Sequence, residues 1–365
     1  MTKVIFGKNK RFYLKKIIKK SNNILIISSK RGKKRFINEN KFNLKKNCKI
    51  DWIDHISSNP DLSKINKIFK SFERTNYDFI VGIGGGSVLD VSKIIKLHFI
   101  NEKLNNKIEL ICIPTTAGTG SEVTQFSTIW DFKLKKKISI EDLKMKPNYA
   151  IVDPILSYTV PKEITFSTGL DALNQCFDSL WNKNSKSIVK NLSINSIVTI
   201  FKGLKKISKN INDKEARDLL SFGSLKSGEC ISKTKTSICH SISYPLTLNF
   251  GIDHGYACAF SMLAVINLVN RKNPIFFNKL INKLKMKNFD EFFGSINDLL
   301  KVLNVNHYCI KKIKKYNKLE KVIPQMFNRK RLNNFIYVSN INRKRLISIL
   351  NCSFNENHKN FKFNI

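Results

Sequence analysis

The stretch DFIVGIGGGSVLD, residues 78–90, decides the fold class of this chain. It opens as a short apolar run and passes into three consecutive glycines. The residues that follow, VLDVSKIIKLHF (88–99), carry apolar side chains three and four positions apart. A strand, a glycine turn and an amphipathic helix in this order predict a βα unit of a parallel sheet.

Three further runs extend this pattern. NILIISS (23–29), LICIPTT (110–116) and YAIVDP (149–154) are each typical of a short buried strand. After Pro161 the character changes, because long amphipathic stretches dominate and no comparable strand runs follow. We therefore predict an α/β N-terminal Rossmann-like domain with a parallel sheet over 1–160, followed by an all-α C-terminal domain over 161–365.

The composition is strongly basic, with 65 Lys and Arg against 27 Asp and Glu and a formal net charge of +38. One interpretation is nucleic-acid binding through neutralised phosphates. The other is a general richness in Lys, Asn and Ile, because the basic residues are spread along the whole chain and no nucleic-acid-binding motif accompanies them. We favour the second and expect no nucleic-acid partner, although such a surface would attract small anionic substrates.

The cysteines and the N-terminus bear on the compartment. None of the eight cysteines forms a C-x-x-C pair, and several stand in apolar runs, which favours reduced, buried thiols. The opening MTKVIFGKNKRF contains no apolar signal region. No apolar run approaches the ~18 residues of a membrane span. We expect a cytoplasmic protein with no membrane partner.

Two polar turns follow predicted strands. The three glycines allow close backbone approach, and the N-terminus of the next helix favours a phosphate. The second turn, PTTAGTGSE (114–122), adds hydroxyls and two more glycines. Either could simply be a tight βα connection. Because the carboxyl ends of parallel strands meet at one edge of a sheet, both together indicate a ligand crevice.

Two of the six histidines, His240 and His254, lie near the two ends of the segment CHSISYPLTLNFGIDHG (239–255), which we expect to be a loop. Each histidine alone could be a hydrogen-bonded core residue. The pair also suits a metal site, since imidazole is a common metal ligand.

Four motifs occur in order: GGGSVLDVSK (84–93), PTTAGTGSEVT (114–124), TGLDAL (168–173) and the two histidines with thirteen residues between them. Together they resemble the iron-containing (group III) alcohol dehydrogenase family, whose fold is dehydroquinate synthase-like. The segments STIWD (127–131), DSLWNKN (178–184) and HSISYPLT (240–247) are similar to the phosphonoacetaldehyde reductase branch of that family.

The resemblance implies a metal bound by one Asp and three His. Asp171, His240 and His254 match three of these positions. The remaining position, four residues after the Asp, holds Gln175 here. Residues i and i+4 share a helix face, so the geometry survives, but an amide oxygen is a weaker donor than imidazole. The metal could be Fe²⁺, Zn²⁺ or another divalent ion, or the site could have lost it.

The resemblance also implies an NAD(P)H site in the first domain. Ser29 follows the first predicted strand, and the basic residues after it favour NADPH over NADH, unless they reflect composition alone. Lys137 matches a family lysine near the cofactor. The cofactor-binding residues expected are Ser29, Gly84, Gly85, Gly86, Ser87, Asp90, Thr115, Thr116, Thr119, Ser121 and Lys137.

The activity implied is metal-assisted reduction of phosphonoacetaldehyde to 2-hydroxyethylphosphonate, with a possible homodimer as the active form. The alternative is a general primary-alcohol dehydrogenase of the same family; a catalytically decayed relic and a basic nucleic-acid-binding protein are the others. Tyr244 stands where many members have a further His and could pass a proton, or could be a packed aromatic. Lys235 is the expected contact for a small anionic aldehyde, although most lysines here are solvated; Asn182 and Asn184 could add amides.

Overall fold

A computed structural model describes residues 1–365 apart from 20–22, 40–47, 58–59, 73–74, 132–135 and 356–365. The chain forms two compact units, Met1–Val160 and Pro161–Ile365. The division falls where the sequence changes from strand-rich to helix-rich.

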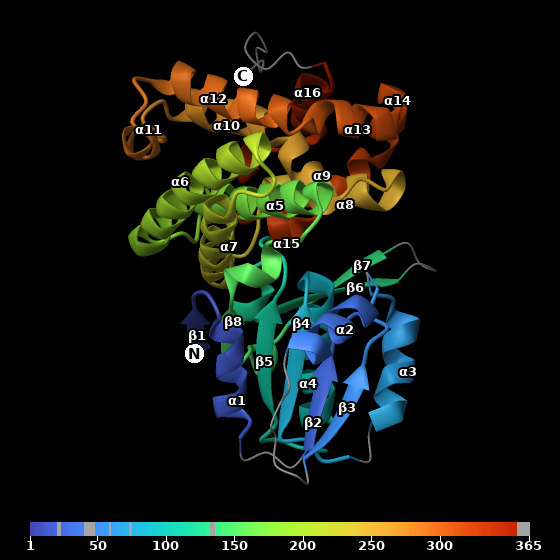
Figure 1. The fold of residues 1–365 in the computed structure, drawn as a ribbon. Coiled ribbons are helices and arrows are strands. Elements are labelled where there is room, and N and C mark those ends of the chain that lie inside the picture. Colours follow the sequence, from blue (N-terminus) through green and yellow to red (C-terminus); the bar gives the residue numbers. More distant parts are fainter. Residues whose placement is uncertain (20–22, 40–47, 58–59, 73–74, 132–135, 356–365) are drawn as a thin grey trace. The chain divides into compact units, whose positions relative to one another are not determined.

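The unit Met1–Val160 is built on a six-stranded sheet (Figure 1). Its strands run in the order β1-β8-β5-β4-β2-β3, and every neighbouring pair is parallel, which confirms the predicted fold class. The sequence did not predict two short strands at its edges, each of which mixes charged with apolar residues. The strands are β1 (Lys3–Phe6), β2 (Asn23–Ile27), β3 (Lys49–Ile53), β4 (Phe79–Gly84), β5 (Glu109–Pro114) and β8 (Tyr149–Val152).

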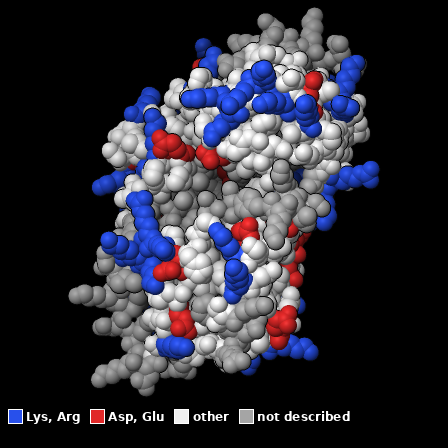
Figure 2. Space-filling model, turned by 90° about the vertical axis from the view of Figure 1, so that its right-hand side faces the viewer, with Lys and Arg blue, Asp and Glu red and all other residues white. Residues whose placement is uncertain are grey.

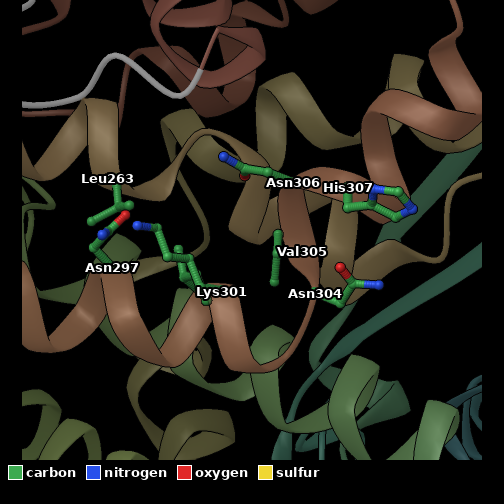
Figure 3. A pocket seen from close by; sticks show the side chains of 8 residues that line it. Leu263, Asn297, Lys301, Asn304, Val305, Asn306 and His307 are labelled. Carbon is green, nitrogen blue, oxygen red and sulfur yellow. The ribbon is translucent and has the colours of Figure 1, made fainter.

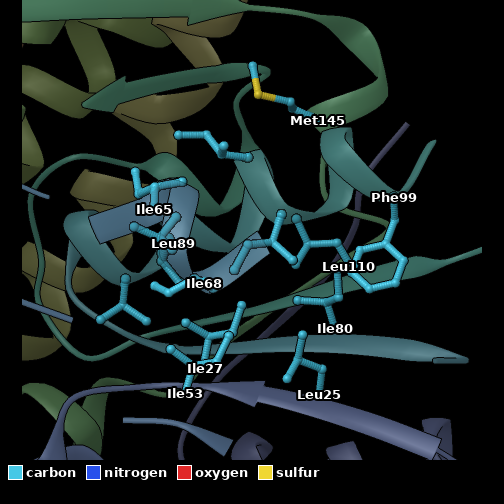
Figure 4. Packing of buried hydrophobic residues seen from close by; sticks show 14 of the residues in the cluster. Leu25, Ile27, Ile53, Ile65, Ile68, Ile80, Leu89, Phe99, Leu110 and Met145 are labelled. Carbon is cyan, nitrogen blue, oxygen red and sulfur yellow. The ribbon is translucent and has the colours of Figure 1, made fainter. Parts of the chain in front are cut away.

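Both faces of this sheet are buried, as parallel sheets require. Leu25 and Ile27 of β2 point into a core with α3 (Leu62–Phe72) and α4 (Gly86–Asn101), which Figure 4 shows. Ile24 and Ile26 of the same strand point into a second core with Leu14 of α1 (Leu14–Ile17). Because successive side chains of a strand alternate, one apolar run supplies both cores.

An antiparallel hairpin that the sequence did not predict follows the sheet's fifth strand in the chain. Its strands are β6 (Phe126–Asp131) and β7 (Lys136–Glu141), paired from Phe126 opposite Glu141 to Asp131 opposite Lys136. Ile129 of β6 is buried in the core on the α4 side.

The unit Pro161–Ile365 is helical throughout its described residues (Figure 1). Glycines let its first three helices cross closely: a Cβ at Gly169 would lie 2.7 Å from Leu204, and one at Gly223 would lie 2.4 Å from Ile200. None of the chain's described helices combines the length and the apolar character that a bilayer span requires. The helices are α5 (Lys162–Leu180), α6 (Ser187–Lys209), α7 (Lys214–Thr234), α8 (Ile238–Phe250), α9 (His254–Phe260), α10 (Met262–Lys272), α11 (Asn278–Leu284), α12 (Phe289–Val302), α13 (Val305–Ile313), α14 (Tyr316–Val322), α15 (Arg329–Leu332) and α16 (Arg343–Phe354).

The prediction of a loop over 239–255 is wrong. Residues Ile238–Phe250 form helix α8 with Pro245 inside it, and only 251–253 separate this helix from α9. Ile238, Ile242 and Leu246 recur every four residues and are fully buried. This apolar stripe outweighs the one backbone hydrogen bond that a proline removes.

Candidate active site

Four side chains from three helices of the unit Pro161–Ile365 converge in one place. Asp171 comes from α5, His240 from α8, and both His254 and Cys258 from α9. One donor atom of each lies within 4.8 Å of the others, and we call these residues the four-donor cluster. His240 Nε2 lies 3.3 Å and His254 Nε2 lies 3.9 Å from Asp171 Oδ1. The structure thus brings together three of the predicted metal ligands.

A glycine explains how α9 comes this close to α5. A Cβ at Gly255 would lie 1.7 Å from the carbonyl oxygen of Ser167 and 3.1 Å from the backbone nitrogen of Asp171. No side chain fits at that distance, so only glycine allows the two backbones to touch. The contact places His254, the preceding residue, beside Asp171.

A second carboxylate orients His240. Asp178, which is fully buried one helical turn beyond Gln175 on α5, accepts a hydrogen bond from His240 Nδ1 at 2.7 Å. It also accepts from Ser237 N at 2.8 Å and from Trp181 Nε1 at 3.0 Å. Because a carboxylate surrounded by donors can only accept, Nδ1 of His240 carries a proton and Nε2 faces the cluster.

Charge around His240 is balanced by its neighbours. Burial opposes a charge on this ring, but Cys258, Asp171 and Asp178 outweigh it and raise the pKa of the imidazole well above its ordinary value. Burial likewise opposes a charge on Asp178, yet the hydrogen bonds from His240 and Ser237 hold the pKa of its carboxyl below the ordinary value. The surroundings of His240 therefore favour a positive charge between Asp171 and Asp178.

Cys258 and Asp178 are the members of this site that the sequence did not reveal. His254 and Cys258 stand at i and i+4 of one helix, which is the spacing that places two side chains on one face. The motif HGYACAF contained this spacing, but its apolar surroundings made Cys258 resemble an ordinary core cysteine. Asp178 could not be predicted from the sequence, because its distant partners come from residues 237–240, which form the N-cap and first turn of α8.

Gln175, the fourth predicted ligand, contacts α7 through one end of its amide. Its amide Oε1 accepts a hydrogen bond from the hydroxyl of Ser227 on α7 at 2.9 Å. The same hydroxyl contacts the carbonyl of Ser224 at 2.8 Å. Whichever way the amide is turned, one of its ends faces Ser227.

Tyr244, predicted to be catalytic, lies against the cluster. Its ring stacks on His254, with centroids 5.3 Å apart and an interplanar angle of 3°. Arg331 of α15 lies over the same ring, with its Cζ 4.3 Å from the centroid. The structure therefore adds a guanidinium to this site that the sequence did not predict.

Lys235 lies in the turn between α7 and α8, and Asn182 lies between α5 and α6. Lys235 is exposed and has a left-handed φ of 65°. Asn182 is 1% exposed, and its amide donates to the carbonyl of Thr234 in that turn at 2.9 Å. Asn182 thus holds this turn, while Asn184 is exposed.

In the unit Met1–Val160 the two predicted polar turns pack on each other. We call residues 84–87 the glycine turn and residues 115–121 the threonine turn. A Cβ at Gly86 would lie 2.6 Å from Thr119, and one at Gly85 would lie 3.4 Å from Thr116. The backbone nitrogen of Thr115 also donates to the carbonyl of Gly84 at 2.9 Å.

Helix α4 begins directly at the glycine turn. Gly85 is its N-cap and Gly86 its first residue, and Ser87 follows. The first amides of a helix have no partner within it and carry its positive dipole end. Gly85, Gly86, Ser87 and Thr116 are partly exposed, so this turn can receive a phosphate.

Asp90 and Ser121 support the turns from within. The Ser121 hydroxyl donates to Asp90 Oδ1 at 2.5 Å, and the backbone nitrogen of Thr128 donates to Asp90 Oδ2 at 2.8 Å. The fully buried ammonium of Lys93 donates to Ser121 and Thr124 at 2.6 and 2.9 Å. The polar groups of these predicted cofactor residues are therefore used to hold the threonine turn and β6 in place.

Ser29 and Lys137 lie at the ends of other elements. Ser29 Oγ accepts from the backbone nitrogen of Gly32 at 3.1 Å at the start of α2 (Lys30–Glu39). Lys33, one of the cations expected near the nucleotide, is paired with Asp54 at 2.8 Å. Lys137 on β7 lies over the ring of Trp130, 5.5 Å from its centroid.

A separate hollow lies between α12 and α13 (Figure 3). Its volume is 110 Å³, and Lys301 and His307 are its titratable residues. Ligand pockets usually measure about 300–1,000 Å³. None of the predicted site residues lines this hollow, and it is too small to receive a nucleotide.

Comparison with known proteins agrees with this arrangement of two units. Residues 1–154 match the model of the family described as iron-containing alcohol dehydrogenase, and residues 165–351 match the C-terminal model of the Fe-containing alcohol dehydrogenase family. The chain belongs to the iron-containing alcohol dehydrogenase family. It is an oxidoreductase of a family that uses NAD(P) and a divalent metal.

Individual members of the iron-containing alcohol dehydrogenase family resemble the chain to different extents. An NADPH-dependent butanol dehydrogenase of Clostridium saccharobutylicum is 28% identical over 283 residues, 73% of this chain and 72% of that protein. A phosphonoacetaldehyde reductase of Streptomyces viridochromogenes is 30% identical over 203 residues, about half of each chain at 51%. A crystal structure of an iron-containing alcohol dehydrogenase, 25% identical, superposes with a TM-score of 0.82 over 97% of both chains.

Proposed function

We propose that the protein reduces phosphonoacetaldehyde to 2-hydroxyethylphosphonate with NADPH. The glycine and threonine turns would hold the nucleotide, and the four-donor cluster would hold a divalent metal. A metal in that cluster would act as a Lewis acid on the aldehyde carbonyl, and the reduced nicotinamide would supply the hydride. The remaining tasks belong to the chain's own side chains.

Proton delivery is the first of these tasks. An alkoxide formed from the aldehyde needs a proton, and Tyr244 is the hydroxyl-bearing ring stacked on His254. We assign proton transfer to Tyr244.

We propose phosphonoacetaldehyde as the substrate because the site offers a cation for its anionic end. A phosphonate needs cations or several donors, and a guanidinium offers a fork that matches its oxygens. The single observation that supports this choice is Arg331 on the ring that stacks on His254. Lys235 is the second proposed cation.

The wider surface would help an anion to reach the site. Lys and Arg side chains stand in several separate groups on the face shown in Figure 2, with Asp and Glu between them. An excess of positive charge spread in this way raises the encounter rate of small anions without forming one binding patch.

A general aldehyde reductase is the second candidate, and one observation favours it. The butanol dehydrogenase aligns over a larger share of both chains than the phosphonoacetaldehyde reductase does. The neutral substrate named in that protein's description would not use Arg331.

Steady-state kinetics with the metal-loaded protein separate the two candidates. We expect kcat/KM for phosphonoacetaldehyde to exceed that for butyraldehyde, and NADPH to support a higher kcat/KM than NADH. Arg331→Gln should lower kcat/KM for phosphonoacetaldehyde by about tenfold to a hundredfold, as the loss of a charge-assisted hydrogen bond does, while leaving that for butyraldehyde nearly unchanged. Arg329→Gln, an exposed residue of the same helix, is the matched control. Equal kcat/KM for both aldehydes in the native protein would reject the phosphonate and leave the general reductase.

A further inference from the structure

We propose that Cys258, and not Gln175, supplies the fourth ligand of the metal. The site would then consist of one carboxylate, two imidazoles and one thiolate. This inference rests on the proposed metal-dependent function, but it does not depend on which aldehyde is reduced.

The spacing of the donor atoms supports a four-ligand site. Metal bonds to N, O and S ligands of about 2.0–2.3 Å, arranged as a tetrahedron, place neighbouring donors about 3.3–3.8 Å apart. Asp171 Oδ1 and His240 Nε2 are 3.3 Å apart, and Asp171 Oδ1 and His254 Nε2 are 3.9 Å apart. Cys258 Sγ lies 3.8 Å from His254 Nε2. Two of these distances fall within that range and the third exceeds it by 0.1 Å, while all four donor atoms lie within 4.8 Å of one another.

The hydrogen-bond partners of His240 favour a cation between these donors. His240 Nδ1 donates to Asp178, so in the neutral ring Nε2 carries a lone pair and points at Asp171 Oδ1. Two lone pairs 3.3 Å apart repel unless a proton or a metal ion lies between them. A metal held by Asp171 and His240 relieves this repulsion and leaves the Asp178 hydrogen bond in place.

Cys258 meets the requirements for a ligand on its own helix. It stands one turn after His254 on α9, and the Gly255 contact fixes the start of that helix against α5. Its thiol is fully buried, whereas the His254 side chain is 30% exposed. The cluster is thus exposed to solvent on the His254 side and closed on the thiol side.

Gln175 is the weaker candidate on two counts. One end of its amide is used by Ser227, and its oxygen is a neutral donor. We assign it the role of a supporting residue that ties α5 to α7.

The donor set also predicts which metal is preferred. A thiolate is a soft ligand, and mixed nitrogen and sulfur sites hold Zn²⁺ more strongly than Fe²⁺. We expect this member of an iron-named family to bind Zn²⁺ more tightly than Fe²⁺.

The test is a metal titration of the full-length chain without nucleotide or aldehyde. Chelator-treated protein is titrated with Co²⁺, which reports a sulfur ligand through a thiolate-to-cobalt charge-transfer absorption in the near ultraviolet. We expect the native protein to show this absorption and Cys258→Ser to lose it. Cys258→Ser should also weaken Zn²⁺ binding by at least about tenfold, measured against a chromophoric chelator. Gln175→Ala and Cys352→Ser, the latter an equally buried cysteine on α16, should retain the absorption.

Each outcome decides the proposal. A native Co²⁺ complex without charge-transfer absorption overturns it, as does Gln175→Ala losing Co²⁺ while Cys258→Ser keeps it with the absorption unchanged. If Cys258→Ser does not fold by circular dichroism, X-ray absorption of the native Zn²⁺ protein decides, because one sulfur ligand is expected and none refutes the assignment. Failure of the native protein to bind any divalent metal would instead reject the metal-dependent function itself. A metal complex without sulfur would leave that function intact.

Discussion

The glycine and threonine turns and the four-donor cluster solve the problem of binding in opposite ways. The turns of the unit Met1–Val160 require glycines, which have no side chain, because a Cβ at Gly86 would lie 2.6 Å from Thr119. The cluster of the unit Pro161–Ile365 depends on atoms that are present, namely donors carried by three helices and oriented by Asp178. One site offers backbone amides to a phosphate, and the other offers side-chain lone pairs to a cation.

This difference determines how each site fails. Adding a methyl group damages the turns, while a change of one atom in a donor damages the cluster even where the volume is kept. Substitutions that add bulk in one unit and substitutions that exchange donors in the other should therefore affect different measurements. Three predictions test that separation.

The largest effect is expected at Asp171. Asp171→Asn keeps the size of the side chain but removes the negative charge that His240 Nε2 and His254 Nε2 both face. We expect Co²⁺ affinity to fall sharply and kcat/KM to fall by about 100- to 1,000-fold, the usual cost of removing one preorganised electrostatic group. The dissociation constant of NADPH, measured by fluorescence, should stay unchanged.

Asp298→Asn is the control for that loss of charge, because Asp298 is an exposed residue of α12. It should leave both metal affinity and kcat/KM at the native values. An Asp171→Asn protein that keeps its metal and its activity would show that the reaction uses a different site.

The second effect concerns Gly86. Gly86→Ala places a methyl group 2.6 Å from Thr119 Cγ2 and 2.9 Å from Thr119 Oγ1. We expect NADPH to bind about tenfold more weakly and the free energy of unfolding to fall by about 1–3 kcal/mol, as overpacking costs. Co²⁺ binding should not change, since the donors lie in the other unit.

Two variants show whether the clash is the cause. The double variant Gly86→Ala/Thr119→Ala removes the methyl and hydroxyl that the new Cβ meets, so it should recover part of the lost stability. Gly294→Ala, at a helical glycine with nothing within 4 Å of the added Cβ, should raise stability by about 0.5–1 kcal/mol. Equal losses in Gly86→Ala and Gly294→Ala, measured by chemical denaturation, would contradict the explanation.

The same contrast explains how far the sequence predicted each region. The glycine turn and its helix are contiguous, so their strand, turn and periodicity can be recognised locally. Asp171, His240 and His254 were expected as ligands because their motifs resemble those of the family. Cys258 was not, because its neighbours along α9 are apolar and only the fold shows that it faces three other donors.

The helix α8 and the residue Asp178 show the physical limits of local patterns. The segment 239–255 was expected to be a loop, but tertiary burial of one apolar stripe makes most of it a helix. Asp178 is buried by partners that lie at least 59 positions further along the chain or next to the end of its own helix, such as Ser237 and Trp181. Long-range hydrogen bonds of this kind leave no periodic trace in the sequence.

The smallest effect is expected at Lys93, which combines the two principles, since a buried side chain there holds the backbone of the threonine turn. Burial lowers the pKa of its ammonium below the ordinary value, against the opposing attraction of Asp90, Cys112 and Glu122. Between the lowered pKa of the folded state and the ordinary lysine pKa of about 10.4, the folded state therefore binds fewer protons than the unfolded state. The stability of the native protein rises with pH across that window.

Lys93→Met removes this titration and the hydrogen bonds to Ser121 and Thr124, at a net cost of about 1 kcal/mol at neutral pH. We expect the stability difference between native and variant proteins, measured by urea unfolding at several pH values, to widen as the pH is raised. A difference that stays constant or narrows would show that Lys93 does not titrate in this way.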